Sequence, residues 1–227
     1  MVYDVIHIQK EVSIPFDIIV PRRKDLIISK TTKKNVSYPT HDGIKKNRIY
    51  KPIETKIVQD ILNLYKPDNN LLIVDYNTNY YFSFMCAVQK FNVLYINPNQ
   101  RYNKFLDMTK IMNNVSFTNF NTRFKVNKIV KTKFVPLLIV NDTIDILNSK
   151  RILRKKLHNI LIIRDRIEDT LDVYNDILKL GFKLYQIKKN LEFISDIKTF
   201  IEEDSESSIL AVSTGSKYKM YATVFFD

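Results

Sequence analysis

The hydrophobic pattern of the chain changes near residue 50. After Pro52, apolar residues recur every three or four positions until Pro67, which is the spacing of one face of an α-helix. The residues on this face are Ile53, Ile57, Val58, Ile61, Leu62 and Tyr65. Pro52 suits the first helical position, where a backbone N–H is not required. The segment is therefore predicted to be an amphipathic helix.

Beyond this helix, the pattern changes to short continuous apolar runs that are rich in β-formers. Such runs are typical of strands buried on both faces, and the longer segments between them suit crossover helices. The runs cover residues 71–75, 93–96, 115–120, 135–140 and 159–163. Their alternation with helical segments predicts an α/β fold with an open, mostly parallel sheet and helices on both faces.

Local signals near the C-terminus predict one more helix and a hairpin. Asp165 followed by Glu168 is typical of a helix start, and Gly181 is typical of the residue just beyond a helix end. Residues 209–212 and 218–226 then flank a short polar turn. They predict a C-terminal antiparallel hairpin placed at the end of the sheet.

The first fifty residues differ from the rest of the chain. They contain strand-like pieces at 2–8 and 16–20 and a basic stretch with several turn formers. The remaining length is enough for one domain with a single large core. We therefore expect an N-terminal extension over residues 1–49 and one Rossmann-like α/β domain over residues 50–227.

Scarce residue types exclude several kinds of site. The chain has three glycines, Gly43, Gly181 and Gly215, which excludes the glycine-rich phosphate loops of P-loop and dinucleotide enzymes. One cysteine, Cys86, excludes an internal disulfide, and the three histidines show no zinc-binding spacing. We expect no metal. The N-terminus lacks a signal-peptide pattern and no apolar run is long enough to span a membrane, so an intracellular protein is expected.

The charge of the chain is strongly basic. Lys and Arg number 36 against 24 Asp and Glu, which gives a net charge of +12 and favours anionic partners such as nucleic acid or acidic proteins. Basic residues interleaved with phenylalanines in the central part are candidates for nucleic-acid contacts. These candidates are Arg101, Lys104, Arg123, Lys125 and Lys128. A solvated, lysine-rich face is the alternative interpretation.

Two segments at the ends of predicted strands carry a family resemblance. In LLIVDYNTNYYFSF, three residues are in register with the pattern D-x-G-A-N-x-G-[YF]-[YF]-[ST]: Asp75, Asn79 and Phe82. Ser83 lies one position before the [ST] of the pattern. After the next run, Pro98 and Asn99 match the end of E-P-[ND]. From about Tyr50 to its end, the chain resembles the FkbM-type family of S-adenosylmethionine-dependent methyltransferases.

The resemblance implies a methyltransferase sheet with a S-adenosylmethionine site at the carboxyl ends of its first two strands. The residues at the corresponding positions are Asp75, Asn77, Asn79, Tyr81 and Asn97. Asn77 and Tyr81 replace glycines of the pattern, and Asn97 replaces an acidic residue that binds the ribose. Overpacking and lost charged hydrogen bonds cost roughly 1–3 kcal/mol each, so we expect weak or lost cofactor binding. Asp75 also suits a cap for the following helix.

The loop after the first run is aromatic. Tyr80, Tyr81, Phe82 and Phe84 either stack on an adenine or a nucleobase or pack a helix onto the sheet. Cys86 follows in an apolar helical stretch and is expected to be buried and inert. His158 has no cysteine or serine nucleophile beside it in sequence, so no catalytic role is assigned to it.

Three functions are consistent with these residues. The departures from the family pattern favour a degenerate methyltransferase-fold protein, a pseudo-enzyme that acts as a non-catalytic binding or assembly subunit within a larger particle. The first alternative is an active O-methyltransferase that uses S-adenosylmethionine and relies chiefly on positioning of the reactants. The second alternative is a nucleic-acid-binding protein that uses its basic surface.

Overall fold

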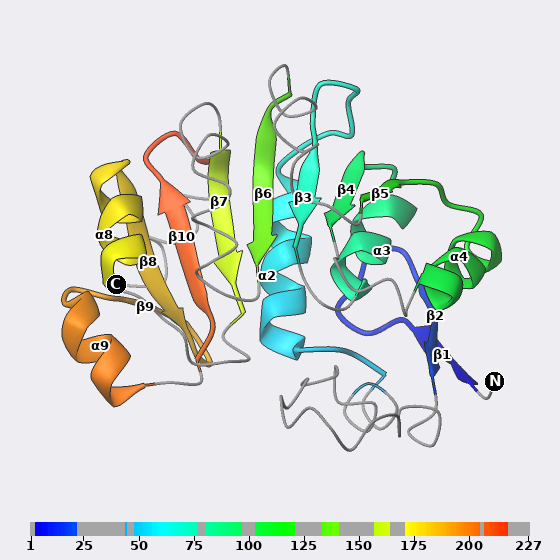
Figure 1. Ribbon diagram of the computed structural model, residues 1–227, viewed down its shortest axis with the longest axis horizontal. Coiled ribbons are helices and arrows are strands. Elements are labelled where there is room, and N and C mark those ends of the chain that lie inside the picture. Colours follow the sequence, from blue (N-terminus) through cyan, green and yellow to red (C-terminus); the bar gives the residue numbers. More distant parts are fainter. Residues whose placement is uncertain are drawn as a thin grey trace.

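The computed structural model contains two sheets and helices on both faces of the larger one (Figure 1). The larger sheet has eight strands in the order β5-β4-β3-β6-β7-β10-β8-β9, and β1 pairs with β2 in a separate two-stranded sheet. The residues that the structure describes are 3–21, 44, 48–76, 80–96, 103–120, 133–140, 157–163, 171–204 and 207–217.

The elements have the following bounds. The strands are β1 (Tyr3–Ile8), β2 (Phe16–Pro21), β3 (Ile73–Asp75), β4 (Val93–Ile96), β5 (Thr118–Phe120), β6 (Val135–Val140), β7 (Leu157–Ile162), β8 (Phe182–Ile187), β9 (Leu191–Phe193) and β10 (Ile209–Ser213). The helices are α2 (Pro52–Asn63), α3 (Tyr81–Val88), α4 (Asn103–Met112), α8 (Leu171–Lys179) and α9 (Ile197–Glu203).

The five continuous apolar runs form the parallel part of the sheet. β3 pairs in parallel with β4 and β6, β4 pairs with β5, and β6 pairs with β7. All residues of β3, β4 and β6 are buried, as expected for strands that are covered on both faces. The predicted α/β fold with a mostly parallel sheet is therefore confirmed. β5 begins at Thr118, three residues later than the run predicted.

The C-terminal part of the sheet is antiparallel, as predicted, but its order differs from the expectation. β10 lies between β7 and β8 and is antiparallel to both, rather than at the end of the sheet. Residues Ile209–Val212 are all buried, which suits an interior strand. β9 pairs antiparallel with β8 and occupies the edge. The predicted strand 218–226 lies outside the described residues.

The helix predictions hold wherever the structure describes them. α2 begins at Pro52 and buries Ile57, Val58 and Ile61. α8 ends just before Gly181, whose φ of +84° is the left-handed conformation that favours glycine beyond a helix end. The predicted start of that helix, at Asp165 and Glu168, lies outside the described residues.

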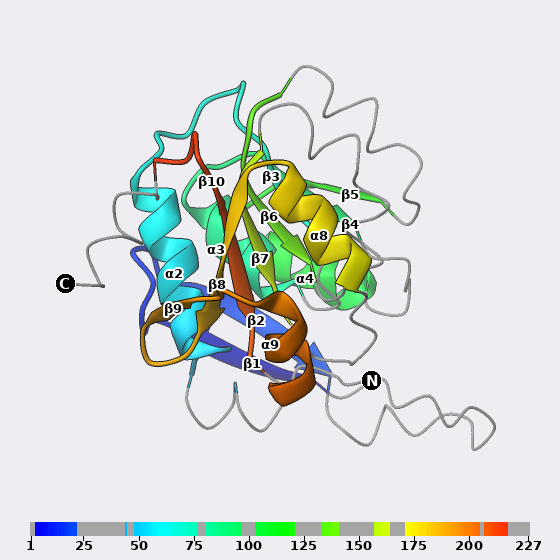
Figure 2. The same ribbon diagram turned by 90° about the vertical axis from the view of Figure 1, so that its left-hand side faces the viewer.

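The core forms two layers, one on each face of the larger sheet. One layer combines apolar side chains of α2, α3 and α4 with those of β1 and β2. The other layer lies under α8 and α9. Figure 2 shows α2 on one side of the sheet and α8 on the other. No helix within the described part of the chain has the length and apolar character needed to cross a membrane.

Candidate ligand edge at the end of strand β3

The sheet topology locates the candidate site. From β3 the chain moves outward to β4 and β5 and then returns to β6 on the other side of β3. Ligands of open α/β sheets bind outside the carboxyl ends of the strands where the order reverses in this way. The arrowhead of β10 points to the upper edge in Figure 1, so the parallel strands end at the lower edge, near β1 and β2. Asp75, the last residue of β3, lies at this reversal.

Asp75 is a buried residue that connects β3 to α3. Its side chain is 0% exposed, and Oδ2 accepts a hydrogen bond of 2.6 Å from the hydroxyl of Ser83. Ser83 belongs to the first turn of α3, so the carboxylate joins the end of β3 to the start of the following helix. Because this bond involves a side-chain hydroxyl and not a backbone N–H, it is not a helix cap, and the N-cap residue of α3 is Tyr80.

Cys86 lies on the same helix and is fully buried, as predicted. Burial raises the pKa of its thiol well above the ordinary value, and the nearby charge of Asp75 raises it further. Because the thiolate is the reactive form, this environment leaves Cys86 an inert packing residue.

Tyr81 is the first residue of α3 and is also 0% exposed. Its ring contacts the rings of Phe16, Tyr50 and Phe82 at centroid distances of 5.5, 5.6 and 5.4 Å. Burial raises the pKa of its hydroxyl to about 12, against a smaller lowering effect of the nearby polar groups of Thr55 and Tyr50. The ring is thus a core side chain that joins α3 to β2.

The remaining aromatic side chains of this segment are buried as well. Tyr80, Phe82 and Phe84 have at most 5% of their surface exposed. Edge-on contacts join Phe84 to Tyr80 and to Phe117. The packing interpretation of these rings is confirmed, since buried rings cannot serve as a platform for bases.

Side chains of α4 and of the residues that flank α3 and α4 close the outer edge of β2 by hydrogen bonds to its backbone. The Tyr80 hydroxyl donates a hydrogen bond to the Ile19 carbonyl, and the Ile19 N–H donates to Thr109 Oγ1 at 3.1 Å. Asn113 accepts from the Asp17 N–H at 2.8 Å and donates to the Asp17 carbonyl at 2.7 Å. An open strand edge would leave these backbone groups without partners. Here the side chains take the place of a third strand.

Removing these side chains should release β2. We expect Thr109→Val to lower the free energy of unfolding by about 1–3 kcal/mol, because it leaves the buried Ile19 N–H unpaired, and Asn113→Ala to lower it by about 1 kcal/mol, because the Asp17 backbone groups are only part-buried. Amide exchange in β2 should become faster in both variants. Asp107→Ala, on the exposed face of α4, is the matched control and should change neither quantity. Unchanged exchange in β2 would show that these bonds do not hold the hairpin.

The structure describes only part of the predicted site. Asp75 and Tyr81 lie at the two ends of the β3–α3 connection, and both are buried. Lys104 is exposed on α4. The other candidates lie outside the described residues, namely Asn77, Asn79, Asn97, Arg101, Arg123, Lys125 and Lys128. No group of three or more potential metal ligands occurs among the described residues.

A polar cluster at the start of β7 was not predicted. The Tyr65 hydroxyl and His158 Nδ1 form a hydrogen bond of 2.9 Å, and the Ser216 hydroxyl donates to Asn159 Oδ1 at 2.8 Å. Lys217 Nζ lies 5.1 Å from the centre of the Tyr65 ring. The cluster fixes the turn after β10 to the end of α2. The only sequence signal for this cluster is the pair of polar residues, His158 and Asn159, at the start of an apolar run.

This cluster predicts a pH dependence of stability. Burial lowers the pKa of His158, and the charge of Lys217 lowers it further. As the pH falls below the ordinary histidine pKa of about 6.5, the unfolded chain takes up a proton at His158 before the folded protein does. The folded state is therefore fully stable with respect to this group above about pH 6.5 and loses stability below it. Urea unfolding should give a lower stability at pH 5 than at pH 8. His158→Gln should weaken that loss.

Comparisons with known proteins find similarity only to solved structures. No protein-family model matches the chain, and a search of curated proteins finds no match. A similar solved structure is an rRNA methylase from Streptococcus thermophilus, with 12% identity, a TM-score of 0.49, and coverage of 78% of this chain and 97% of that one. A putative methyltransferase from Streptococcus mutans in complex with SAH is also similar, with 15% identity, a TM-score of 0.43, and coverage of 69% and 95%.

Proposed function

We propose that this chain is a methyltransferase-fold protein of FkbM type whose cofactor edge has become part of the core, and that it acts by binding or assembly instead of methyl transfer. The observation that carries the proposal is the position of Tyr81. The family pattern has a glycine there, and this chain has a tyrosine that is 0% exposed within a cluster of aromatic rings.

The Tyr81 ring supports the proposal through its contacts. A glycine at the start of the helix lets the backbone approach a ligand closely. The tyrosine ring instead contacts Phe16 of β2 and Tyr50, so that the N-terminal hairpin packs against the residue that faces the cofactor in the family pattern. Returning this position to a cofactor-binding role would require removing a core side chain.

Asp75 supports both the proposed kinship to the FkbM family and the proposed loss of the cofactor edge. Asp75 matches the first position of the FkbM pattern, which agrees with kinship to that family. Its carboxylate accepts a hydrogen bond from the Ser83 hydroxyl on α3. The same carboxylate is 0% exposed and binds α3 to β3. It therefore has a structural role that does not require a cofactor.

Calorimetric titration with S-adenosylmethionine and S-adenosylhomocysteine tests the proposal. We expect no saturable heat up to millimolar ligand, which corresponds to a binding free energy weaker than about −4 kcal/mol. Saturable one-to-one heat would overturn the proposal and favour the active methyltransferase, provided that Asp75→Asn, folded by circular dichroism, reduces that heat. A control variant for the titration is Lys104→Ala on the exposed face of α4, which should behave as wild type.

A further inference from the structure

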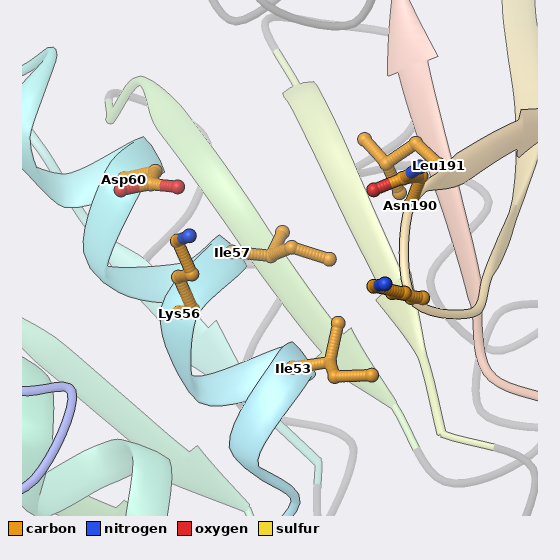
Figure 3. A pocket seen from close by; sticks show the side chains of 7 residues that line it. Ile53, Lys56, Ile57, Asp60, Asn190 and Leu191 are labelled. Carbon is orange, nitrogen blue, oxygen red and sulfur yellow. The ribbon is translucent and has the colours of Figure 1, made fainter. Parts of the chain in front are cut away.

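A small groove lies between α2 and the connection from β8 to β9 (Figure 3). The order of the sheet places β9 at the edge opposite to β5, with β6, β7, β10 and β8 between it and β3. The groove is thus separate from the Asp75 edge. Its lining residues are Ile53, Lys56, Ile57, Asp60, Lys189, Asn190 and Leu191.

The walls of the groove are held in place by the fold. The Ser208 hydroxyl, just before β10, donates a buried hydrogen bond of 2.6 Å to Glu54 Oε1 on α2. The Ile187 N–H at the end of β8 donates to the Ser208 carbonyl at 2.8 Å. These two bonds connect α2 to the end of β8. The groove is therefore formed before any partner binds.

The floor of the groove is apolar. Ile57 and Leu191 are buried, whereas Ile53 is 40% exposed and points toward the same space (Figure 3). The volume of about 100 Å³ is smaller than the roughly 300 Å³ or more of a typical small-molecule pocket. It suits a single aliphatic side chain better than a complete cofactor.

The rim of the groove carries two exposed lysines. Neither Lys56 nor Lys189 has an ion pair with a described residue. Asp60 lies one turn beyond Lys56 on α2, and burial raises the pKa of its carboxyl group, although Lys56 lowers it. The charge of Glu11, which is not a lining residue, also raises the pKa of Asp60. Among the lining residues themselves, two lysines accompany one carboxylate, and Lys189 is the lysine from the other wall that can meet an anion.

These features favour one class of occupant. A nucleic acid would use aromatic rings for stacking and would avoid a carboxylate, but the groove has no aromatic lining residue and includes Asp60. A second copy would also carry the net charge of +12, which opposes self-association. A peptide with one aliphatic side chain and flanking acidic residues matches both the floor and the rim.

We propose that the groove between α2 and β9 binds an acidic segment of a partner protein through one aliphatic side chain. The side chain packs on Ile53, Ile57 and Leu191, and the flanking carboxylates lie near Lys56 and Lys189. This proposal goes beyond the proposed function and does not depend on it, because cofactor binding at Asp75 involves neither wall of the groove.

Fluorescence anisotropy can test the proposal with a labelled pentapeptide that has a central leucine between two pairs of glutamates. The double variant Lys56→Glu, Lys189→Glu should weaken binding at least about tenfold, because exposed ion pairs are replaced by repulsion. The matched control is Lys66→Glu, Lys183→Glu, whose exposed lysines follow α2 and lie on β8. Both double variants lower the net charge from +12 to +8, so general electrostatics affects them equally. The control should bind within about twofold of wild type.

Two further probes test the floor of the groove. Replacing the central leucine of the peptide with glycine should weaken binding, and so should the surface variant Ile53→Ser in a protein whose circular dichroism is unchanged. Two results of the peptide titration would overturn the proposal: no saturable binding of the leucine peptide, or an equal loss of affinity in both double variants. It would also be overturned if a single-stranded oligonucleotide competed with the peptide for the same lysines. A wild-type dimer in sedimentation that the variant Lys56→Glu, Lys189→Glu dissociates would overturn it as well.

Discussion

Replacing Tyr81 with alanine is expected to lower the free energy of unfolding by about 3–5 kcal/mol, which is the usual cost of truncating a buried aromatic side chain. The expectation follows from a ring that is 0% exposed and contacts Phe16, Tyr50 and Phe82. Part of the loss should appear as faster amide exchange in β2, because Phe16 then loses its contact with the Tyr81 ring. Urea unfolding followed by circular dichroism measures the total.

Two variants separate the ring from other effects. Tyr81→Phe keeps the ring and removes the hydroxyl, so it should cost only about 1 kcal/mol. Tyr3→Ala removes a tyrosine that is 39% exposed on β1 and should change the stability much less than Tyr81→Ala. If Tyr81→Ala instead proved as stable as wild type, position 81 would not belong to the core, and the proposed loss of the cofactor edge would have no structural basis.

The second large effect is expected at the contact between Asp75 and Ser83. Ser83→Ala removes one donor from a buried carboxylate, and Asp75→Ala removes the acceptor of a buried hydroxyl, so each should cost about 1–3 kcal/mol. Once one partner is gone, removing the other should cost less than it does in the wild-type protein. A double-mutant cycle in urea should therefore give a coupling energy of about 1–3 kcal/mol.

Additive effects in this cycle would contradict the structural role of Asp75. Coupling below about 0.5 kcal/mol is the range of independent sites, and it would mean that the carboxylate does not stabilise α3 through Ser83. Ser13→Ala and Asp75→Ala form a control pair from separate elements. Because Ser13 contacts Gln59 through its backbone N–H, the side-chain change should be additive with Asp75→Ala.

The parallel part of the sheet could be predicted from the sequence because its strands are buried on both faces. Val135–Val140 is buried at every position, and a fully buried strand needs a continuous apolar run. β8 is not among the predicted runs, because it begins at Phe182, directly after the helix-ending Gly181, with no separate turn signal before it. The position of β10 between β7 and β8 depends on pairing with distant strands, which a local pattern does not encode.

The candidate site was only partly predictable for a similar reason. Asp75 and Tyr81 were found through a family pattern, and their burial required the structure. The bonds that hold β2 join Ile19 to Thr109 and Asp17 to Asn113, which are 90 and 96 positions apart in the chain. Thr109 and Asn113 are four residues apart at the end of α4, but nothing near them in sequence points to a strand in the first twenty residues.

Hydrogen–deuterium exchange of the β3–α3 region, with and without millimolar S-adenosylhomocysteine, tests the central claim most directly. If the end of β3 is filled by the side chains of the protein itself, amides of Tyr81–Val88 should be protected without ligand, and adding the ligand should leave them unchanged. Ligand-dependent protection confined to this helix and to residues 73–76 would contradict the account, because it would show a functioning cofactor edge.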